Sequence, residues 1–340
     1  PTLSSPPARR FVCASPVTYN AEETFCSLNF AARVNSVELG PSATELARDG
    51  GSGIAATFPH EGSIKVANDK GKEKTWTVDQ VFDFNTNQAQ VFDEVSDLVT
   101  SVLDGYNVCI FAYGQTGSGK TFTMMGPPDN RGVNTRSLEA LFASSTARAH
   151  EIEDEVQVSI LEIYNETIRD LLAQDVGDRK LEVRQDAVKG MYVPDLTLVP
   201  VVSMAEVLEL LDVADQNRSV ASTNMNQHSS RSHLMLSCYI ESKNKVDGSS
   251  SRGKLHLIDL AGSERIDKSG ATGAALKEAQ NINKSLSALG DVIAARANKQ
   301  GHVPFRNSTL TYLLQDSLSK DSKTLMCAAA RERASARASR

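Results

Sequence analysis

The chain has 340 residues, of which 40% are hydrophobic and 23% are charged. This composition is that of an ordinary globular protein and excludes a collagen-like repeat or a wholly disordered chain. The 36 basic and 42 acidic residues give a net charge of −6, which excludes bulk attraction to nucleic acid. No segment approaches the roughly 18 apolar residues of a membrane helix. The five scattered cysteines lack a CxxC pair, which argues for a reducing compartment and against a disulfide framework or a zinc site.

Hydrophobic patterning divides the chain into segments. Residues 1–9 are rich in proline and serine and are predicted to be disordered, and 22–39 have apolar positions at helical spacing. A glycine-rich stretch over 41–53 is predicted to be a flexible linker. From residue 54 onward, strand-like and helix-like runs alternate, which predicts an α/β fold with helices on both faces of a central sheet. Residues 328–340 are almost all Ala, Arg, Ser and Glu and are predicted to form a disordered basic tail.

The individual elements follow from the same patterns. The expected strands are 63–67, 75–81, 107–113, 156–163, 234–240 and 254–259, and the expected helices are 88–103, 137–149, 204–217, 274–296 and 310–317.

A phosphate-binding loop follows the apolar strand 107–113. The segment reads Gly114-Gln115-Thr116-Gly117-Ser118-Gly119-Lys120-Thr121, which fits the pattern G-x-x-x-x-G-K-[ST]. Glycines allow backbone N–H groups to turn toward phosphate oxygens, and the start of the following helix favours an anion. Lys120 supplies a cation for the β and γ phosphates, and the Thr121 hydroxyl is a ligand for Mg²⁺. The loop therefore predicts a nucleoside triphosphate site.

Two further polar segments have the groups that hydrolysis needs. Asp259 follows the apolar run 255–258, where a carboxylate at a strand end suits a Mg²⁺ site, and the Gly262 N–H suits a contact to the γ-phosphate. Glu264 ends this segment. A third segment supplies the hydroxyls of Ser229 and Ser230 and the guanidinium of Arg231, which is expected to pair with Glu264 when phosphate is bound. By composition alone, this third segment is also an ordinary polar loop before a strand.

Taken together, these motifs resemble a kinesin motor domain. The matching segments are F-A-Y-G-Q-T-G-S-G-K-T-F-T-M-M-G (111–126), S-S-R-S-H (229–233), D-L-A-G-S-E (259–264), N-I-N-K-S-L-S-A-L-G (281–290) and H-V-P-F-R-N-S (302–308). The similarity extends over residues 54–326, and the segments around the phosphate loop most resemble the C-terminal-motor, minus-end-directed class. The resemblance implies a P-loop NTPase fold with a central, mostly parallel twisted sheet.

The resemblance also implies a function and its residues. It implies hydrolysis of ATP with Mg²⁺, coupled to the binding of microtubules (tubulin) and to force generation. It also implies a location in the cytoplasm, on the microtubule cytoskeleton. Ser229, Ser230 and Arg231 would form switch I, and Asp259, Gly262 and Glu264 would form switch II. The metal would be held by Thr121, Ser230 and, through water, Asp259. The microtubule-binding residues would be Lys284, His302 and Arg306, since basic groups suit the acidic surface of tubulin.

The order of the segments departs from the family. Residues 15–40 resemble the last strand exit and last helix of a kinesin motor, which in the family follow the segment written here as 321–326. The 10–40 segment is therefore interpreted as a displaced C-terminal strand and helix, ahead of a motor core at 54–327. Joining Met326 to Phe11 would restore one familiar-looking strand. Two explanations are open: a circular permutation, or the end of one motor copy fused to a truncated second copy by a gene-model error.

A second departure concerns the first strand. The family begins with a strand that ends in R-x-R-P and packs on adenine, and this chain contains no R-x-R-P. The sequence therefore predicts that this strand is absent or shortened. Thr309 also stands where the family commonly has lysine, which predicts weaker contact with the track.

Three functions remain to be distinguished. They are an active microtubule-stimulated ATPase, a degenerate motor that binds microtubules without efficient turnover, and a P-loop NTPase unrelated to tubulin. His228 and His233 are expected to be structural rather than general bases. No long heptad run is present, so dimerisation would need elements outside this chain.

Overall fold

The computed structural model describes residues 9–14, 56–57, 59–60, 62–67, 73–82, 86–174, 180–187, 189–222, 230–264, 273–319 and 321–330. The predicted helix 22–39, the linker 41–53 and the tail beyond residue 330 lie outside these ranges.

The described elements are groups of strands separated by helices. The strands are β1 (Arg9–Ala14), β2 (Ala56–Thr57), β3 (Ser63–Ala67), β4 (Glu73–Thr77), β5 (Gln80–Phe82), β6 (Asn107–Tyr113), β7 (Ile152–Tyr164), β8 (Thr167–Asp170), β9 (Arg184–Asp186), β10 (Gly190–Tyr192), β11 (Val199–Pro200), β12 (Ser232–Asn244), β13 (Ser250–Asp259) and β14 (Lys323–Ala330). The helices are α2 (Gln88–Asp93), α3 (Ser96–Thr100), α4 (Lys120–Met124), α5 (Val133–Arg148), α6 (Met204–Ser222), α7 (Gly273–Ala297) and α8 (Thr309–Leu313), with 3-10 turns η2 (Ser101–Asp104) and η5 (Phe305–Asn307).

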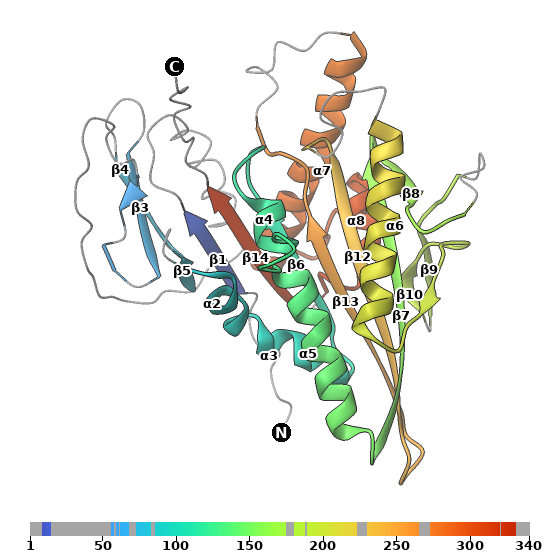
Figure 1. Cartoon of the computed structure of the whole chain (residues 1–340). Coiled ribbons are helices and arrows are strands. Elements are labelled where there is room, and N and C mark those ends of the chain that lie inside the picture. The colour runs from blue at the N-terminus through green and yellow to red at the C-terminus, as the bar shows by residue number, and fades with distance from the viewer. Residues whose placement is uncertain are drawn as a thin grey trace, which may run out of the picture.

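One large sheet forms the centre of the molecule, in the order β11-β7-β12-β13-β6-β14-β1-β5, and β8 pairs with β7 (Figure 1). The half that runs from β13 through β6, β14 and β1 to β5 is parallel. The other half is antiparallel, because β12 pairs in opposite directions with β7 and β13, and β8 and β11 are antiparallel to β7. The α/β class is confirmed, and the sheet is mixed, with parallel pairing confined to one half.

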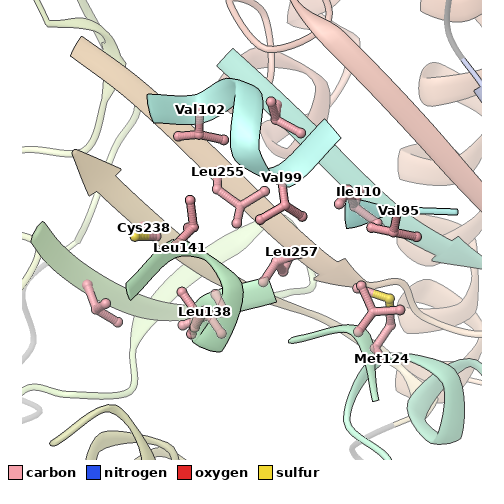
Figure 2. Close-up of a cluster of buried hydrophobic side chains, with 14 of the residues drawn as sticks. Val95, Val99, Val102, Ile110, Met124, Leu138, Leu141, Cys238, Leu255 and Leu257 are labelled. Carbon is pink, nitrogen blue, oxygen red and sulfur yellow. The ribbon is translucent and has the colours of Figure 1, made fainter. Parts of the chain in front are cut away.

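Helices cover both faces of this sheet, and each face has its own apolar core. On one face, α2, α3, α5 and α6 pack on the strands. Figure 2 shows part of this core, with Val95, Val99, Val102, Ile110, Met124, Leu138, Leu141, Cys238, Leu255 and Leu257 labelled. On the other face, α7 and α8 cover the side chains that point the opposite way from the same strands. Full burial of each such aliphatic side chain contributes about 1.5–3 kcal/mol, so these two layers fix the sheet.

The predicted helices 137–149, 204–217 and 274–296 are confirmed, and the predicted helix 310–317 is shorter, ending at Leu313. The expected helix 88–103 is divided into α2, α3 and η2. Asn87 caps α2 with a capping box, and the Ser96 hydroxyl donates to the Asp93 carbonyl oxygen (3.0 Å) where α2 ends. Such side-chain bonds to nearby carbonyls compete with helix continuation, which explains the break. No helix in the described part of the chain is both long and apolar enough to cross a membrane.

The N-terminal strand does not lie where the sequence predicts. Instead of continuing β14 end to end, β1 lies beside it in parallel register, with Phe11 opposite Cys327. Its other edge pairs with β5, where Val12 lies opposite Val81. β1 therefore fills the position between β14 and β5. The sequence predicts that the family's first strand is absent or shortened, but the sheet has no gap at this place. The permuted order stays a prediction, because residues 15–40 are outside the described ranges.

Residues from both segments that the sequence predicts to be disordered belong to strands. Arg9 already belongs to β1, and Ala328–Ala330 complete β14 instead of starting a tail. Ala328 and Ala329 are each 1% exposed. A Cβ on Gly114, whose φ is +157°, would lie 2.2 Å from the Ala329 carbonyl oxygen, so the phosphate loop begins in close backbone contact with β14. The absence of a side chain on Gly114 allows this approach. The low apolar content of Ala328–Ala330 did not prevent strand formation.

Proline at position 12 tests the place of β1. Because β1 is paired on both sides, every N–H of its central residues bonds to a neighbour, and proline removes one of these bonds and restricts φ. Val12→Pro is expected to lower the free energy of unfolding by about 3 kcal/mol or more, measured by urea unfolding. The control Val12→Ile keeps the N–H and the β-branch and should cost much less. Equal, small losses would show that β1 is not an interior strand.

Candidate functional site

The phosphate loop leaves the end of β6 and returns directly into α4. Gly117 and Gly119 have φ values of +75° and +100°, which L side chains rarely adopt, so these glycines set the turn. Lys120 begins α4, and this helix has only 5 residues. Anion binding here therefore depends on the loop N–H groups more than on a helix dipole. All eight predicted loop residues, Gly114 to Thr121, lie in this turn and the first helical residues.

Two charged groups already engage the loop. Lys120 is 7% exposed and its Nζ donates to the carbonyl oxygens of Gly114 and Gln115, both at 2.9 Å. Burial lowers the pKa of Lys120, and the nearby carboxylates of Asp259 and Glu264 oppose that shift. Glu264 accepts from the Thr116 N–H (2.8 Å) and hydroxyl (2.5 Å). The Glu264 carboxylate is thus bound by a backbone N–H and a hydroxyl of the phosphate loop.

Oxygen donors that suit a hard cation lie beside the loop. The Thr121 hydroxyl donates to Asp259 Oδ2 at 2.5 Å, while Asp259 Oδ1 is buried and accepts no hydrogen bond from the described residues. Burial raises the pKa of Asp259, and the Thr121 bond and the charges of Lys120 and Arg218 oppose that rise. Hydroxyl and carboxylate oxygens are the ligands that Mg²⁺ prefers. The unsatisfied oxygen and the oxygen-only donor set therefore fit this cation.

Backbone hydrogen bonds join the three predicted segments. The Gly262 N–H donates to the Ser230 carbonyl oxygen (2.8 Å), and the Ser263 N–H donates to the Gly114 carbonyl oxygen (3.1 Å). The structure therefore brings together Ser230, Asp259, Gly262 and the loop, as the sequence predicts. The Gly262 N–H is engaged by Ser230, so its expected contact to a γ-phosphate requires a rearrangement. Ser229 lies outside the described residues.

Arg231 and Glu264 do not form the expected pair in this structure. Glu264 binds Thr116, and Arg231 Nη1 lies 2.8 Å from Glu278 Oε2 on α7. Tyr164 also hydrogen-bonds Glu278, and burial together with this carboxylate raises the pKa of Tyr164. Sequence reasoning missed Glu278, because its only signal is an acidic residue on the inner face of a long amphipathic helix. We call the edge of the sheet where the phosphate loop, Ser230–Arg231 and Asp259–Glu264 meet the nucleotide edge. Arg231 connects this edge to α7.

His233 is a structural residue, in agreement with its predicted role. It is 3% exposed; its Nδ1 accepts from the Ala261 N–H (3.0 Å), and its Nε2 lies 2.8 Å from Ser285 Oγ. Burial, with a smaller effect of the Lys120 charge, lowers the pKa of His233 to about 3. The imidazole therefore stays neutral and joins β12, the Asp259 segment and α7. His228 lies outside the described residues.

The predicted track-binding residues lie on the α7 and α8 face. Lys284 is exposed on α7, His302 is exposed in the loop after it, and Arg306 is exposed in η5, 5.2 Å from the Tyr312 ring. Thr309 is not a simple loss of lysine, because its N–H donates to Glu166 Oε2 (2.9 Å) and its hydroxyl to the Glu166 carbonyl oxygen (2.8 Å). Thr309 therefore fixes the start of α8.

The pH dependence of stability tests the burial of His233. Its pKa is about 3 in the folded chain and about 6.5 when unfolded. Between these values the unfolded chain binds one more proton, so stability falls as pH falls, by up to about 1.4 kcal/mol per pH unit. His233→Gln is expected to reduce this slope by about one proton in urea unfolding at pH 4.5–6. The exposed His150→Gln controls for loss of an imidazole. An unchanged slope in His233→Gln would contradict the assignment.

Comparisons with known proteins agree with this arrangement. The family model described as "Kinesin motor domain" matches residues 47–338, which leaves the 10–40 segment outside the match. Kinesin-like protein KIN-14R of Arabidopsis thaliana is 53% identical over 266 residues, covering 78% of this chain and 25% of that protein. Kinesin-like protein KIN-14Q of Oryza sativa subsp. japonica is 52% identical over 281 residues, covering 81% and 29%. The chain thus spans about a quarter of the length of these curated relatives.

Solved structures show the same relation. The structure of a fast kinesin superposes with a TM-score of 0.78 at 38% identity, covering 96% of this chain and 86% of that chain. The motor domain of Kar3 from Saccharomyces cerevisiae superposes with a TM-score of 0.74 at 38% identity, covering 96% and 93%. With the phosphate loop, Ser230–Arg231 and Asp259–Glu264 assembled at one edge of the sheet, the chain belongs to the kinesin motor domain family.

Proposed function

We propose that this chain is a motor domain in which binding to microtubules stimulates ATP hydrolysis. The observation that carries the proposal is the meeting of three separate segments at one sheet edge. The phosphate loop, Ser230–Arg231 and Asp259–Glu264 are linked by the hydrogen bonds Gly262 to Ser230 and Ser263 to Gly114. Phosphoryl transfer requires positioning and charge stabilisation more than covalent chemistry, and these segments supply both.

The residues divide the work of binding and hydrolysis. The loop from Gly114 to Lys120 binds the triphosphate, and Lys120 moves from the loop carbonyls to the phosphate oxygens. Thr121, Ser230 and, through water, Asp259 would hold Mg²⁺, which neutralises charge on the β and γ phosphates. Switch I, with Ser229, and switch II position the attacking water, so no histidine is needed as a base.

Partner exchange by Arg231 couples hydrolysis to the track. In this structure Arg231 binds Glu278 of α7, and Glu264 binds Thr116. A bound γ-phosphate competes with Glu264 for the loop and frees its carboxylate to pair with Arg231. Release of Glu278 then alters how α7 is held. Such order changes around a γ-phosphate are a common way of switching a distant surface.

The surface that we propose faces the microtubule has basic side chains at the predicted track-binding positions. Lys284 is exposed in the middle of α7 and Arg306 is exposed in η5 just before α8, with His302 in the loop between the helices. They suit the acidic surface of tubulin despite the net charge of −6. We place the activity on the microtubule cytoskeleton of the cytoplasm. The similarity to KIN-14 proteins and to Kar3 supports minus-end movement.

A degenerate motor is the alternative. The absence of R-x-R-P favours it, because that pattern packs on adenine in the family. Such a chain would bind microtubules without efficient turnover.

Removal of the loop cation tests the ATPase. Lys120→Ala is expected to lower microtubule-stimulated turnover by at least about 100-fold, because the phosphates lose their cation in the transition state. The exposed Lys180→Ala is the control and should retain turnover. Unchanged turnover in Lys120→Ala would contradict the proposal. If the wild-type chain co-sediments with microtubules but does not hydrolyse ATP, the degenerate motor is selected. If it does not co-sediment with microtubules, an NTPase unrelated to tubulin is favoured.

Charge reversal tests the track surface. The double variant Lys284→Glu, Arg306→Glu is expected to weaken co-sedimentation with microtubules by about 10-fold at low salt, with a smaller effect at high salt. The double variant Lys243→Glu, Lys245→Glu makes the same change in net charge near the β12–β13 hairpin, at the far end of the molecule from the top of α7 (Figure 1), and should bind as the wild type does. Equal weakening by both changes would indicate a net-charge effect and reject this surface.

A further inference from the structure

A fully buried carboxylate lies behind the nucleotide edge. Glu162, near the end of β7, is 0% exposed. Its Oε1 accepts from the Ser232 hydroxyl (2.6 Å) and from Arg218 Nε (3.0 Å), and its Oε2 lies 3.4 Å from Arg169 Nη1. Arg218 Nη2 also donates to Ser232 Oγ (3.1 Å). Glu162, Arg218 and Ser232 form a closed triangle of hydrogen bonds.

The two partners of Glu162 flank the switch I segment in the sequence. Arg218 lies in the last turns of α6, and Ser232 is the first residue of β12, directly after Ser230 and Arg231. One carboxylate thus holds the element before the segment and the element after it. The Ser230 carbonyl, two residues from Ser232, accepts from the Gly262 N–H. The position of Ser232 is therefore transmitted to both switches.

Stability alone gives a weak account of this cluster. A buried ion pair seldom stabilises a fold more than apolar side chains of the same volume would, because desolvation offsets the attraction. Such pairs are instead able to hold groups in one arrangement, since guanidinium and carboxylate geometry is directional. The cluster lies next to Ser230 and Arg231, whose orientation matters for hydrolysis.

We infer that Glu162 is a positioning residue for hydrolysis, which acts through Ser232 and Arg218 on switch I. The expected effect on kcat rests on the proposed function. The expected effect on the position of Ser230 and Arg231 rests on the geometry alone. Because Glu162 acts through Ser232 and Arg218, it sets how often Ser230 and Arg231 are in place rather than how tightly nucleotide binds.

The same strand pair contains a matched control. Asp154 and Ser242, at the other end of β7 and β12, form an equivalent cluster with Arg148. Ser242 Oγ donates to Asp154 Oδ1 (2.5 Å), and Arg148 Nη2 donates to Ser242 Oγ (2.8 Å). The Asp154 side chain is 1% exposed. The two serines are ten residues apart along β12, which is about 33 Å. The control variant therefore removes the same kind of hydroxyl at a place far from Ser230 and Arg231.

The experiment compares Ser232→Ala with Ser242→Ala in the full chain. Both remove one hydroxyl from a buried cluster, so both should lower the melting temperature by a similar few degrees. Only Ser232→Ala is expected to lower microtubule-stimulated kcat, by about 10-fold, with the KM for ATP changed less than about twofold. Glu162→Gln would be the direct change, but it leaves a buried guanidinium without its counter-charge and is liable to prevent folding.

Hydrogen exchange separates this inference from the proposed function. Peptides that contain Ser230 and Arg231 should exchange faster in Ser232→Ala than in the wild type with MgADP, and at the wild-type rate in Ser242→Ala. If the wild type fails to hydrolyse ATP, the proposed function is wrong, and exchange alone decides the positioning role. Equal kcat and equal exchange in the two serine variants would overturn the inference.

Discussion

Strand direction decides where the site of this protein lies. Strands β6 and β13 are parallel, and β12 is antiparallel to β13. The end of β6, the end of β13 and the start of β12 therefore meet at one edge of the sheet. The phosphate loop, Asp259 and Ser230 occupy those three positions. Reversal of any one strand would place its functional segment at the opposite edge, on the order of 30 Å away for a strand of this length.

The β7–β12 pair acts as a rigid support for that edge. Thirteen residues of each strand pair in continuous register from Ser232 opposite Tyr164 to Asn244 opposite Ile152. Each end has a buried carboxylate, Glu162 or Asp154, bound to an arginine and a serine. Directional charge-assisted bonds at both ends restrict how the helices that contribute Arg218 and Arg148 sit on the strands. At the Glu162 end the supported segment leads to the nucleotide edge, whereas at the Asp154 end it leads to a hairpin.

The parallel half of the sheet depends on segments of unpromising composition. Ala328–Ala330 add little apolar area, yet all three pair with β1, and Ala328 also pairs with β6. Backbone hydrogen bonding satisfies groups that would be costly to bury unpaired, so this strand does not need large side chains. The absence of a Cβ on Gly114 permits its backbone to approach the Ala329 carbonyl. Thus a segment expected to be a tail forms the floor beneath the phosphate loop.

The sequence by itself determined the α/β class, most elements and the chemistry of the nucleotide edge. Buried strands such as 107–113 and amphipathic helices such as 204–217 have strong local periodicity, and the loop motif depends on residue types at fixed spacing. The sequence did not reveal that β1 lies beside β14, that Arg231 binds Glu278, or that Glu162 links Arg218 to Ser232. Those contacts join residues far apart in the chain, and many alternative partners fit the same local pattern. Only the tertiary structure decided them, because burial in a shared core selects which distant charges and strand edges must satisfy one another.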